Sequence, residues 1–187
     1  TNVEIIKLDL GIEENCYRLY ELTKDKNIDL LINNAGFGLF GLTTETNLYR
    51  ELEMINLNIK AVHILTKLFL QDFYQKDKGR ILNVASSAGF LAGPRLNTYY
   101  ATKNYVLKFT LAIYEELRHQ KSNVKISCLC PGPVATEFNK VAGGKFNIEE
   151  KKSYQVAKYA IDKTLKNKLI IVPGLSVRLG LFFNRFI

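Results

Sequence analysis

The sequence predicts an α/β fold, a single domain over residues 1–187 built on a doubly wound parallel sheet. Short aliphatic runs alternate along the chain with longer segments of helical periodicity, as in successive βαβ units. The aliphatic runs are nearly continuous in apolar residues, which is typical of strands covered by helices on both faces. A chain of 187 residues is long enough to bury one substantial core.

The predicted elements follow one another without an internal repeat or a low-complexity linker. Glycine, proline and asparagine clusters separate them, and apolar residues recur at helical spacing in the longer segments. In order, they are a strand at Val3–Leu8, a helix at Glu13–Thr23, a strand at Ile28–Ile32, a helix at Tyr49–Tyr74, a strand at Arg80–Val84, a loop at Ala85–Asn97, a helix at Thr98–Gln120, a strand at Val124–Cys130, a helix at Ile148–Leu165 and a strand at Leu169–Val172.

The composition is that of a folded protein with a basic surface. Hydrophobic residues make up 47% of the chain, charged residues 24%, and the formal net charge is +8. Nucleic acid, a membrane surface or a phosphorylated cofactor would each suit that charge. The lysines are scattered, however, and form no basic run with interleaved aromatic residues, so we expect no nucleic-acid partner. No segment offers the roughly 18 apolar residues that a bilayer-spanning helix needs.

The cysteines and histidines indicate neither a disulfide framework nor a metal site. The three cysteines are Cys16, Cys128 and Cys130, an odd number, and no secretory signal opens the chain, so we expect a reducing, cytoplasmic location. Cys128 and Cys130 alternate along a predicted strand and face one side of it. We interpret them as small buried residues rather than a redox pair. His63 and His119 have no partners at ligand spacing.

Three polar or turn motifs each follow a predicted strand. Asn33 follows the strand at Ile28–Ile32, Ser86 follows the strand at Arg80–Val84, and Pro131 ends the strand at Val124–Cys130. Right-handed crossovers place the carboxyl ends of parallel strands at one edge of the sheet, where ligands bind. We therefore expect these motifs to converge on one rim.

Tyr99 and Lys103 lie four residues apart at the start of a predicted helix, which places them on one face, one turn apart. A free tyrosine has a pKa of about 10, and a nearby ammonium lowers it by favouring the phenolate. Such a pair suits a general acid for a carbonyl or a general base for an alcohol. A simple helix-surface pair would show the same spacing.

Ser86 ends a strand 13 residues before Tyr99. The loop between them is rich in small residues, so the serine can fold back toward the helix start. Its hydroxyl could donate to a substrate oxygen as negative charge develops there. A loop-capping role is the competing interpretation, and Ser87 competes with Ser86 for the catalytic one.

Together these motifs resemble those of the short-chain dehydrogenase/reductase family, whose fold is a Rossmann-type sheet. The resemblance runs from Val3 to about Val172 and rests on Asn33-Asn34-Ala35-Gly36, Asn58, Ser86, Tyr99-x-x-x-Lys103 and Pro131-Gly132. Asn56 fits the family register less well than Asn58. The resemblance implies that Tyr99 transfers the substrate proton. It also implies that Lys103 lowers the pKa of Tyr99 and binds the nicotinamide ribose, that Ser86 polarises the carbonyl, and that Asn58 holds a relay water.

The same resemblance implies a set of contacts to NADP, with NAD as the alternative. Asn33, Ala35 and Gly36 would lie against the adenosine side. The remaining contacts would come from Asp9 and Leu10 at the adenine ring, from the Val134 backbone after the Pro131-Gly132 turn, from Thr136, and from Tyr99 and Lys103.

The family's glycine-rich turn, Gly-x-x-x-Gly-x-Gly, is not found in this sequence. Gly36, Gly38 and Gly41 do not replace it, because they follow a strand without opening a clear helix. We therefore expect an N-terminally incomplete domain in which Ile28–Ile32 has an unpaired edge. The choice between NAD and NADP depends largely on charge beyond this sequence, and the basic composition leans toward NADP.

Two segments bear on substrate and partners. Residues 138–152 are the expected substrate lid, with Gly143-Gly144 as a hinge. Its apolar residues could line a site for a lipid-like carbonyl or alcohol, or equally anchor a surface loop. Residues 175–187 form an amphipathic tail that could pack on the domain or lie on a membrane surface. By family analogy we expect a homodimer or homotetramer. A non-catalytic dinucleotide sensor or scaffold on the same fold is the alternative function.

Overall fold

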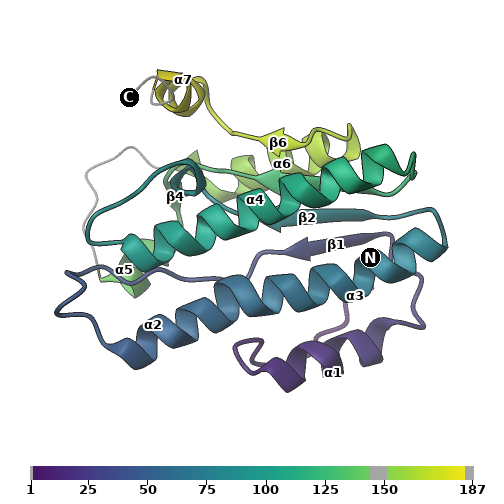
Figure 1. Cartoon of the computed structure of the whole chain (residues 1–187), viewed down its shortest axis with the longest axis horizontal. Coiled ribbons are helices and arrows are strands. Elements are labelled where there is room, and N and C mark those ends of the chain that lie inside the picture. Colours follow the sequence, from purple (N-terminus) through teal and green to yellow (C-terminus); the bar gives the residue numbers. More distant parts are fainter. Residues whose placement is uncertain (1, 144–150, 184–187) are drawn as a thin grey trace.

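The structure is a computed structural model that describes residues 2–143 and 151–183. Its main sheet has four parallel strands in the order β1-β2-β3-β6 (Figure 1). They are β1 at Leu30–Asn33, β2 at Arg80–Val84, β3 at Lys125–Leu129 and β6 at Ile170–Ile171. The predicted parallel α/β sheet is confirmed.

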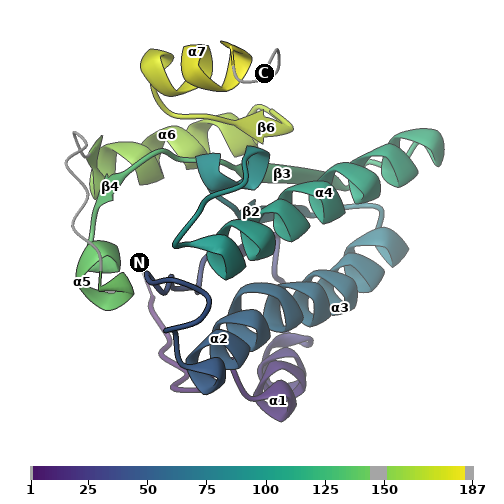
Figure 2. The ribbon, with the colours of Figure 1, turned by 60° about the vertical axis from the view of Figure 1, so that its left-hand side comes forward.

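Helices cover both faces of this sheet (Figures 1 and 2). On one face lie α4, at Asn97–His119, and a long continuous helix made of α2 at Leu48–Ile55, the π-helical turn η1 at Asn56–Ala61 and α3 at Val62–Gln75. On the other face lies α6 at Ser153–Leu165. The doubly wound arrangement follows from this placement.

Successive side chains of a strand pack into the core on opposite sides of the sheet. Ile81 packs with Leu65 and Phe69 of α3, whereas the next residue, Leu82, packs with Val156 of α6. Successive strand residues point to opposite faces, so a strand covered on both sides needs an apolar residue at every position. That requirement explains the continuous aliphatic runs in the sequence.

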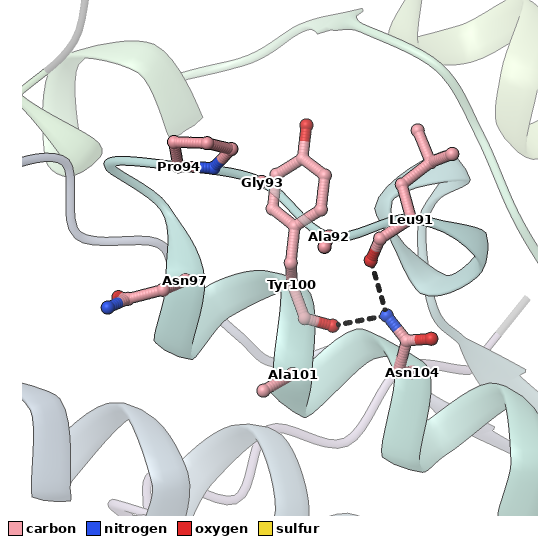
Figure 3. A pocket seen from close by; sticks show the side chains of 8 residues that line it. All are labelled: Leu91, Ala92, Gly93, Pro94, Asn97, Tyr100, Ala101 and Asn104. Carbon is pink, nitrogen blue, oxygen red and sulfur yellow. Dashed lines mark hydrogen bonds between the residues drawn. The ribbon is translucent and has the colours of Figure 1, made fainter. Parts of the chain in front are cut away.

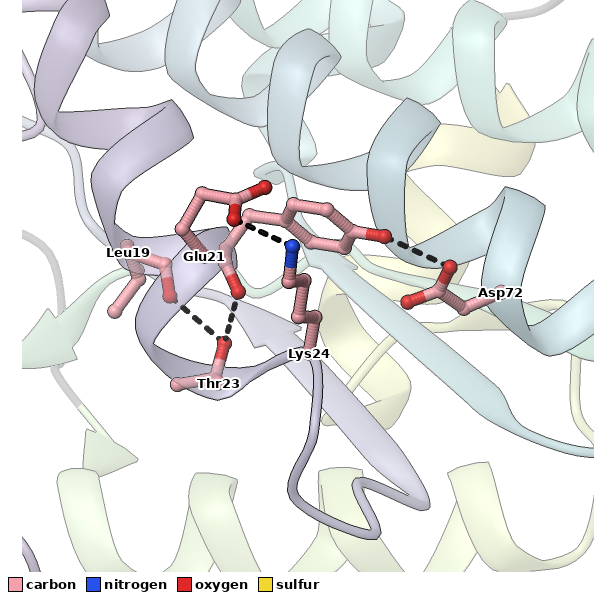
Figure 4. Close-up of polar contacts among 6 residues, drawn as sticks. Leu19, Glu21, Thr23, Lys24 and Asp72 are labelled. Atoms are coloured by element: carbon pink, nitrogen blue, oxygen red, sulfur yellow. Dashed lines mark hydrogen bonds and ion pairs between the residues drawn. The ribbon is translucent and has the colours of Figure 1, made fainter.

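Helix α1, at Glu13–Thr23, packs on the outer side of α3 (Figure 4). The Tyr20 hydroxyl donates to Asp72 Oδ1 at 2.8 Å, and this acceptor raises the pKa of Tyr20 to about 12. Thr23 Oγ1 donates to the Leu19 carbonyl at 2.8 Å. Lys24, just beyond the helix, pairs with Glu21 at 2.6 Å.

The prediction of a strand at Val3–Leu8 is wrong. Residues 2–9 form no helix or strand, and the side chains of Val3 and Ile5 are 81% and 87% exposed. A strand is stabilised by ladder hydrogen bonds and by burial of its apolar face. Within the described residues, no strand pairs with this segment, so apolar composition alone does not make it a strand. Ile32, on the edge strand β1, is correspondingly 43% exposed.

Most other predicted helices and strands differ from the observed ones at their ends. Helix α6 begins at Ser153 because Lys151–Lys152 form β5, which pairs with β4 at Val134–Ala135. The expected lid contains helix α5 at Phe138–Ala142, and its residues 144–150 lie outside the described part of the chain. The expected tail contains α7 at Leu175–Phe183, and residues 184–187 also lie outside it. In the described ranges, no helix is long and apolar enough to cross a bilayer.

All three cysteines are buried with reduced thiols. Cys128 and Cys130 are fully buried on the same side of β3, with their Sγ atoms 3.7 Å apart. The prediction that they are small core residues on one face is confirmed. Cys16 is equally buried between α1 and the core.

A chain of buried polar side chains crosses the core from β1 to α4. Asn33 Nδ2 donates to Thr66 Oγ1 at 3.0 Å and to Asn83 Oδ1 at 2.9 Å. Asn83 Nδ2 in turn donates to Thr110 Oγ1 at 3.0 Å. The four residues are at most 6% exposed, so each polar atom depends on its neighbour for a hydrogen bond.

Candidate active site

The carboxyl ends of β2 and β3 are joined directly. Ala85 N donates to the Leu129 carbonyl at 2.8 Å, and Ser87 N donates to the Pro131 carbonyl at 2.8 Å. Asn33, at the end of β1, is linked to the same rim through Asn83. The motifs that follow these strands therefore share one edge of the sheet, as the sequence predicts.

Lys103 is buried at this edge, on the face of α4 that packs against β2. Its side chain is inside the domain, and its Nζ donates to the Val84 carbonyl at 2.9 Å. Burial disfavours the charged ammonium and lowers the pKa of Lys103 to about 8. The Nζ lies 5.8 Å from the centroid of the Tyr99 ring, so the spacing of four residues does bring the two side chains together.

Tyr99 is half-buried, and two opposing effects act on its hydroxyl. Burial raises the pKa of Tyr99 to about 12, while a hydrogen bond with Ser86 lowers it. The sequence predicts that Lys103 lowers the pKa of Tyr99. In this structure the lowering contact comes from Ser86, because Lys103 donates instead to a backbone carbonyl. The Phe138 ring of α5 packs beside Tyr99, with centroids 5.0 Å apart.

Ser86 has extended backbone and precedes the 3₁₀ turn η2, at Ser87–Phe90. Its Oγ accepts a hydrogen bond from Ala88 N at 3.1 Å. That bond occupies an acceptor site of the hydroxyl and leaves its proton free to be donated. Of the two competing serines, Ser86 is the one with the contact to Tyr99.

Asn58 is fully buried in the π-helical turn η1. Its Nδ2 donates to the Phe37 carbonyl at 2.9 Å and to Thr102 Oγ1 at 3.1 Å, and its Oδ1 accepts from Phe37 N at 3.1 Å. The π-turn inserts an extra residue into the helix, a feature that often marks functional sites. Asn58 thus ties η1 both to the segment after β1 and to the first turns of α4.

The residues that could hold a dinucleotide lie around this group. A Cβ on Gly36 would sit 2.8 Å from Asn58 Oδ1 and 3.4 Å from Lys103 Nζ, so only glycine lets the backbone pass so close. This tight backbone and the buried amine fit the ribose and nicotinamide end of such a cofactor.

The other expected contact residues lie in separate segments of the chain. Ala35 and Thr136 are exposed, and Val134 belongs to β4. Asp9 Oδ1 accepts from Gly11 N at 2.9 Å, while Leu10 packs against the core beneath α1. No group of three or more metal-ligating side chains occurs in residues 2–143 and 151–183.

Sequence reasoning missed several residues that complete the site. Phe37 and Thr102 hold Asn58, and the Val84 carbonyl holds Lys103. Asn104 binds the turn after Ser86. The only available signal was the polar character of Thr102 and Asn104 on a helix next to the tyrosine–lysine pair.

Burial of Lys103 should make stability depend on pH. Its pKa is about 8 in the fold and 10.5 when exposed, so between these values the unfolded chain holds more protons. The contribution of Lys103 to the free energy of unfolding should then rise with pH across that range, by up to about 3 kcal/mol, and stay at its lower level below pH 8. Denaturant unfolding of the parent and of Lys103→Met between pH 7.5 and 10 checks this. Equal slopes in the two proteins would contradict it.

Known proteins resemble the chain along most of its length. A sequence profile described as short chain dehydrogenase matches residues 1–146. An uncharacterized oxidoreductase of Staphylococcus saprophyticus is 30% identical over 165 residues, which are 86% of this chain and 70% of that protein. The bovine dehydrogenase/reductase SDR family member 11 is 30% identical over 71% of this chain, but the match spans only 54% of the bovine protein.

Solved structures show the same architecture. A short-chain dehydrogenase from Sphingobium yanoikuyae, in complex with NADPH, superposes with a TM-score of 0.82 at 25% identity, over 95% of this chain and 70% of that one. A short-chain dehydrogenase/reductase from Burkholderia phymatum, in complex with NAD, gives 0.84 at 20% identity, over 94% and 72%. Fold, family profile and relatives agree: the chain belongs to the short-chain dehydrogenase family.

Proposed function

We propose that this chain carries the catalytic residues of an oxidoreductase that moves hydride between NADP(H) or NAD(H) and a carbonyl or secondary alcohol. The proposal rests on the start of α4, where Tyr99 is hydrogen-bonded with Ser86 and lies close to the buried amine of Lys103. Membership of a dehydrogenase family supports the same chemistry.

Each residue of this group has a distinct task. Tyr99 protonates the substrate oxygen during reduction and takes the proton back during oxidation. Ser86 donates a hydrogen bond to the same oxygen as negative charge develops on it. The nicotinamide, when bound, supplies or accepts the hydride.

Lys103 and Asn58 support the proton transfer by Tyr99. Lys103 binds the nicotinamide ribose through its buried Nζ, which lies 5.8 Å from the centroid of the Tyr99 ring. Asn58 fixes η1 against Thr102, one residue before Lys103, and holds the relay water.

On the cofactor side, we propose a series of backbone and side-chain contacts. Gly36 allows close approach beside Lys103. The other proposed contacts are Asn33 and Ala35 after β1, Asp9 and Leu10 before α1, the turn at Pro131 and Gly132, and Val134 and Thr136 beyond it.

We expect NADPH to bind the protein at least about tenfold more tightly than NADH. A 2′-phosphate adds charge-assisted hydrogen bonds, each of which contributes about 1.5–3 kcal/mol, and the chain carries a net charge of +8. Fluorescence titration with both nucleotides measures the ratio. Equal affinities, or tighter NADH binding, would reverse the assignment.

The substrate is an apolar carbonyl or alcohol, such as a lipid-like ketone. The Phe138 ring beside Tyr99 supports this choice, as does the mixed apolar composition of the expected lid. A panel of ketones and 3-oxoacyl thioesters, tested with the preferred nucleotide, decides it. Tight nucleotide binding without turnover on any member would favour a dinucleotide sensor instead.

The same proposal includes the cellular location and the oligomeric state of the enzyme. We propose a cytoplasmic homodimer or homotetramer, with the exposed faces of α3 and α4 as its contacts. The tail that includes α7 packs on the domain or on a partner subunit. Size-exclusion chromatography with light scattering measures the assembly.

A further inference from the structure

Asn104 makes three hydrogen bonds that none of the roles above explains. Its Nδ2 lies 3.1 Å from the Ala88 carbonyl, 2.9 Å from the Leu91 carbonyl and 2.9 Å from the Tyr100 carbonyl. Figure 3 shows the side chain between the last two of these acceptors. One amide group therefore links two residues of the segment after Ser86 to helix α4. They are Ala88, inside the turn η2, and Leu91, just after it.

The turn lies directly on the helix at this point. A Cβ on Gly89 would come within 2.8 Å of the Lys103 carbonyl oxygen, so the two backbones are in van der Waals contact there. Ala88 and Gly89 are buried. Buried carbonyl groups need donors, and Asn104 supplies the donor to Ala88 from the side chain next to Lys103.

Ala88 connects this anchor to Ser86. Its carbonyl accepts from Asn104, while its N–H donates to Ser86 Oγ at 3.1 Å. The position of the Ala88 peptide groups therefore fixes the direction from which the serine oxygen receives its hydrogen bond. That direction decides where the hydroxyl proton can point.

We propose that Asn104 is a positioning residue that orients the Ser86 hydroxyl toward Tyr99 and the substrate oxygen by holding the peptide groups of Ala88. The inference rests on the proposed function for its catalytic consequence, whereas the contact through Ala88 can be tested without turnover. Misplacing a reacting group by about 1 Å can lower a rate on the order of 100-fold.

The test compares Asn104→Leu with the parent protein. Leucine has a similar size and cannot donate, and residue 104 borders an open depression of about 550 Å³ that can accept its branched end. Asn104→Ser, which keeps one donor, serves as the conservative variant. Asn123→Ala is the matched control, because Asn123 bonds to Asp77 at the opposite end of the domain.

For Asn104→Leu we expect kcat to fall about 10- to 100-fold, with nucleotide affinity unchanged and partial recovery in Asn104→Ser. In the alcohol-oxidising direction, the acid limb of the pH profile should move to higher pH. The Ser86 hydrogen bond lowers the pKa of Tyr99, and a loosened serine lowers it less. Asn123→Ala should leave the profile in place. A change in folding stability alone would not move that limb.

Amide hydrogen exchange gives a second measurement that needs no turnover. The Ala88 N–H, which is held on Ser86 Oγ, should exchange at least about tenfold faster in Asn104→Leu, and protection in α1 should stay the same. Unchanged exchange at Ala88 would overturn the proposal. An unmoved pH profile in an active Asn104→Leu enzyme would also overturn it. Faster exchange at Ala88 in Asn104→Leu, together with a parent protein that shows no turnover, would support the positioning contact and contradict the proposed function instead.

Discussion

Replacing Tyr99 with phenylalanine should lower turnover by about 100- to 10,000-fold, the range that general acid–base catalysis contributes. The substitution removes one hydroxyl and keeps the ring that packs against Phe138, so the fold should be retained. Steady-state kinetics with the preferred nucleotide, in both reaction directions, measures the loss. Nucleotide titration of the same variant shows whether binding survives.

Tyr100→Phe is the matched control for this prediction. Tyr100 is the next residue on α4, and its ring lies against Gly93 in the loop that precedes the helix. The control removes the same atom one position away and should keep turnover within about twofold, as expected for a hydroxyl outside the reaction. Turnover by Tyr99→Phe at the rate of Tyr100→Phe would contradict the mechanism.

Replacing Asn83 with alanine should lower the free energy of unfolding by about 3 kcal/mol or more. Asn83 is fully buried and bonds to Asn33, Thr66 and Thr110. Its loss leaves buried donors and acceptors of these residues without partners, and each such group costs about 1–3 kcal/mol. Urea unfolding, followed by circular dichroism, measures the change.

The control for Asn83 is Asn15→Ala. Asn15 Nδ2 donates a single exposed hydrogen bond to the Asp9 carbonyl, so its loss should cost no more than about 1 kcal/mol. Similar losses in both variants would mean that the polar chain through the core contributes nothing beyond one ordinary hydrogen bond.

The elements that local patterning determines could be predicted to the residue. Helix α1 at Glu13–Thr23 and strand β2 at Arg80–Val84 have the predicted bounds, because periodicity and the flanking glycines define them. Val3–Leu8 has equally apolar residues, yet it forms no strand. A strand depends on a partner as well as on its own sequence, and the sequence of a segment does not show whether a partner lies beside it.

The contacts of the candidate site could likewise be predicted only in part. The proximity of Tyr99 and Lys103 follows from helical geometry alone, and the structure places them together. The contacts of Asn58 and Asn104 run instead to backbone groups of Phe37, Ala88 and Leu91. Those contacts depend on the path of turns, which residue spacing does not determine. The same limit explains why Ser86, and not Lys103, proves to lower the pKa of Tyr99.

The buried thiols make the chain a convenient reporter of its own unfolding. It contains no tryptophan, so the usual fluorescence signal is weak. Cys16, Cys128 and Cys130 are each fully buried, and burial raises the pKa of the Cys16 thiol, so alkylating reagents reach them only when the structure opens. Because Cys16 lies in α1, whereas Cys128 lies in β3 and Cys130 just after it, mass spectrometry of pulse-labelled protein would time the opening of α1 and of the sheet separately.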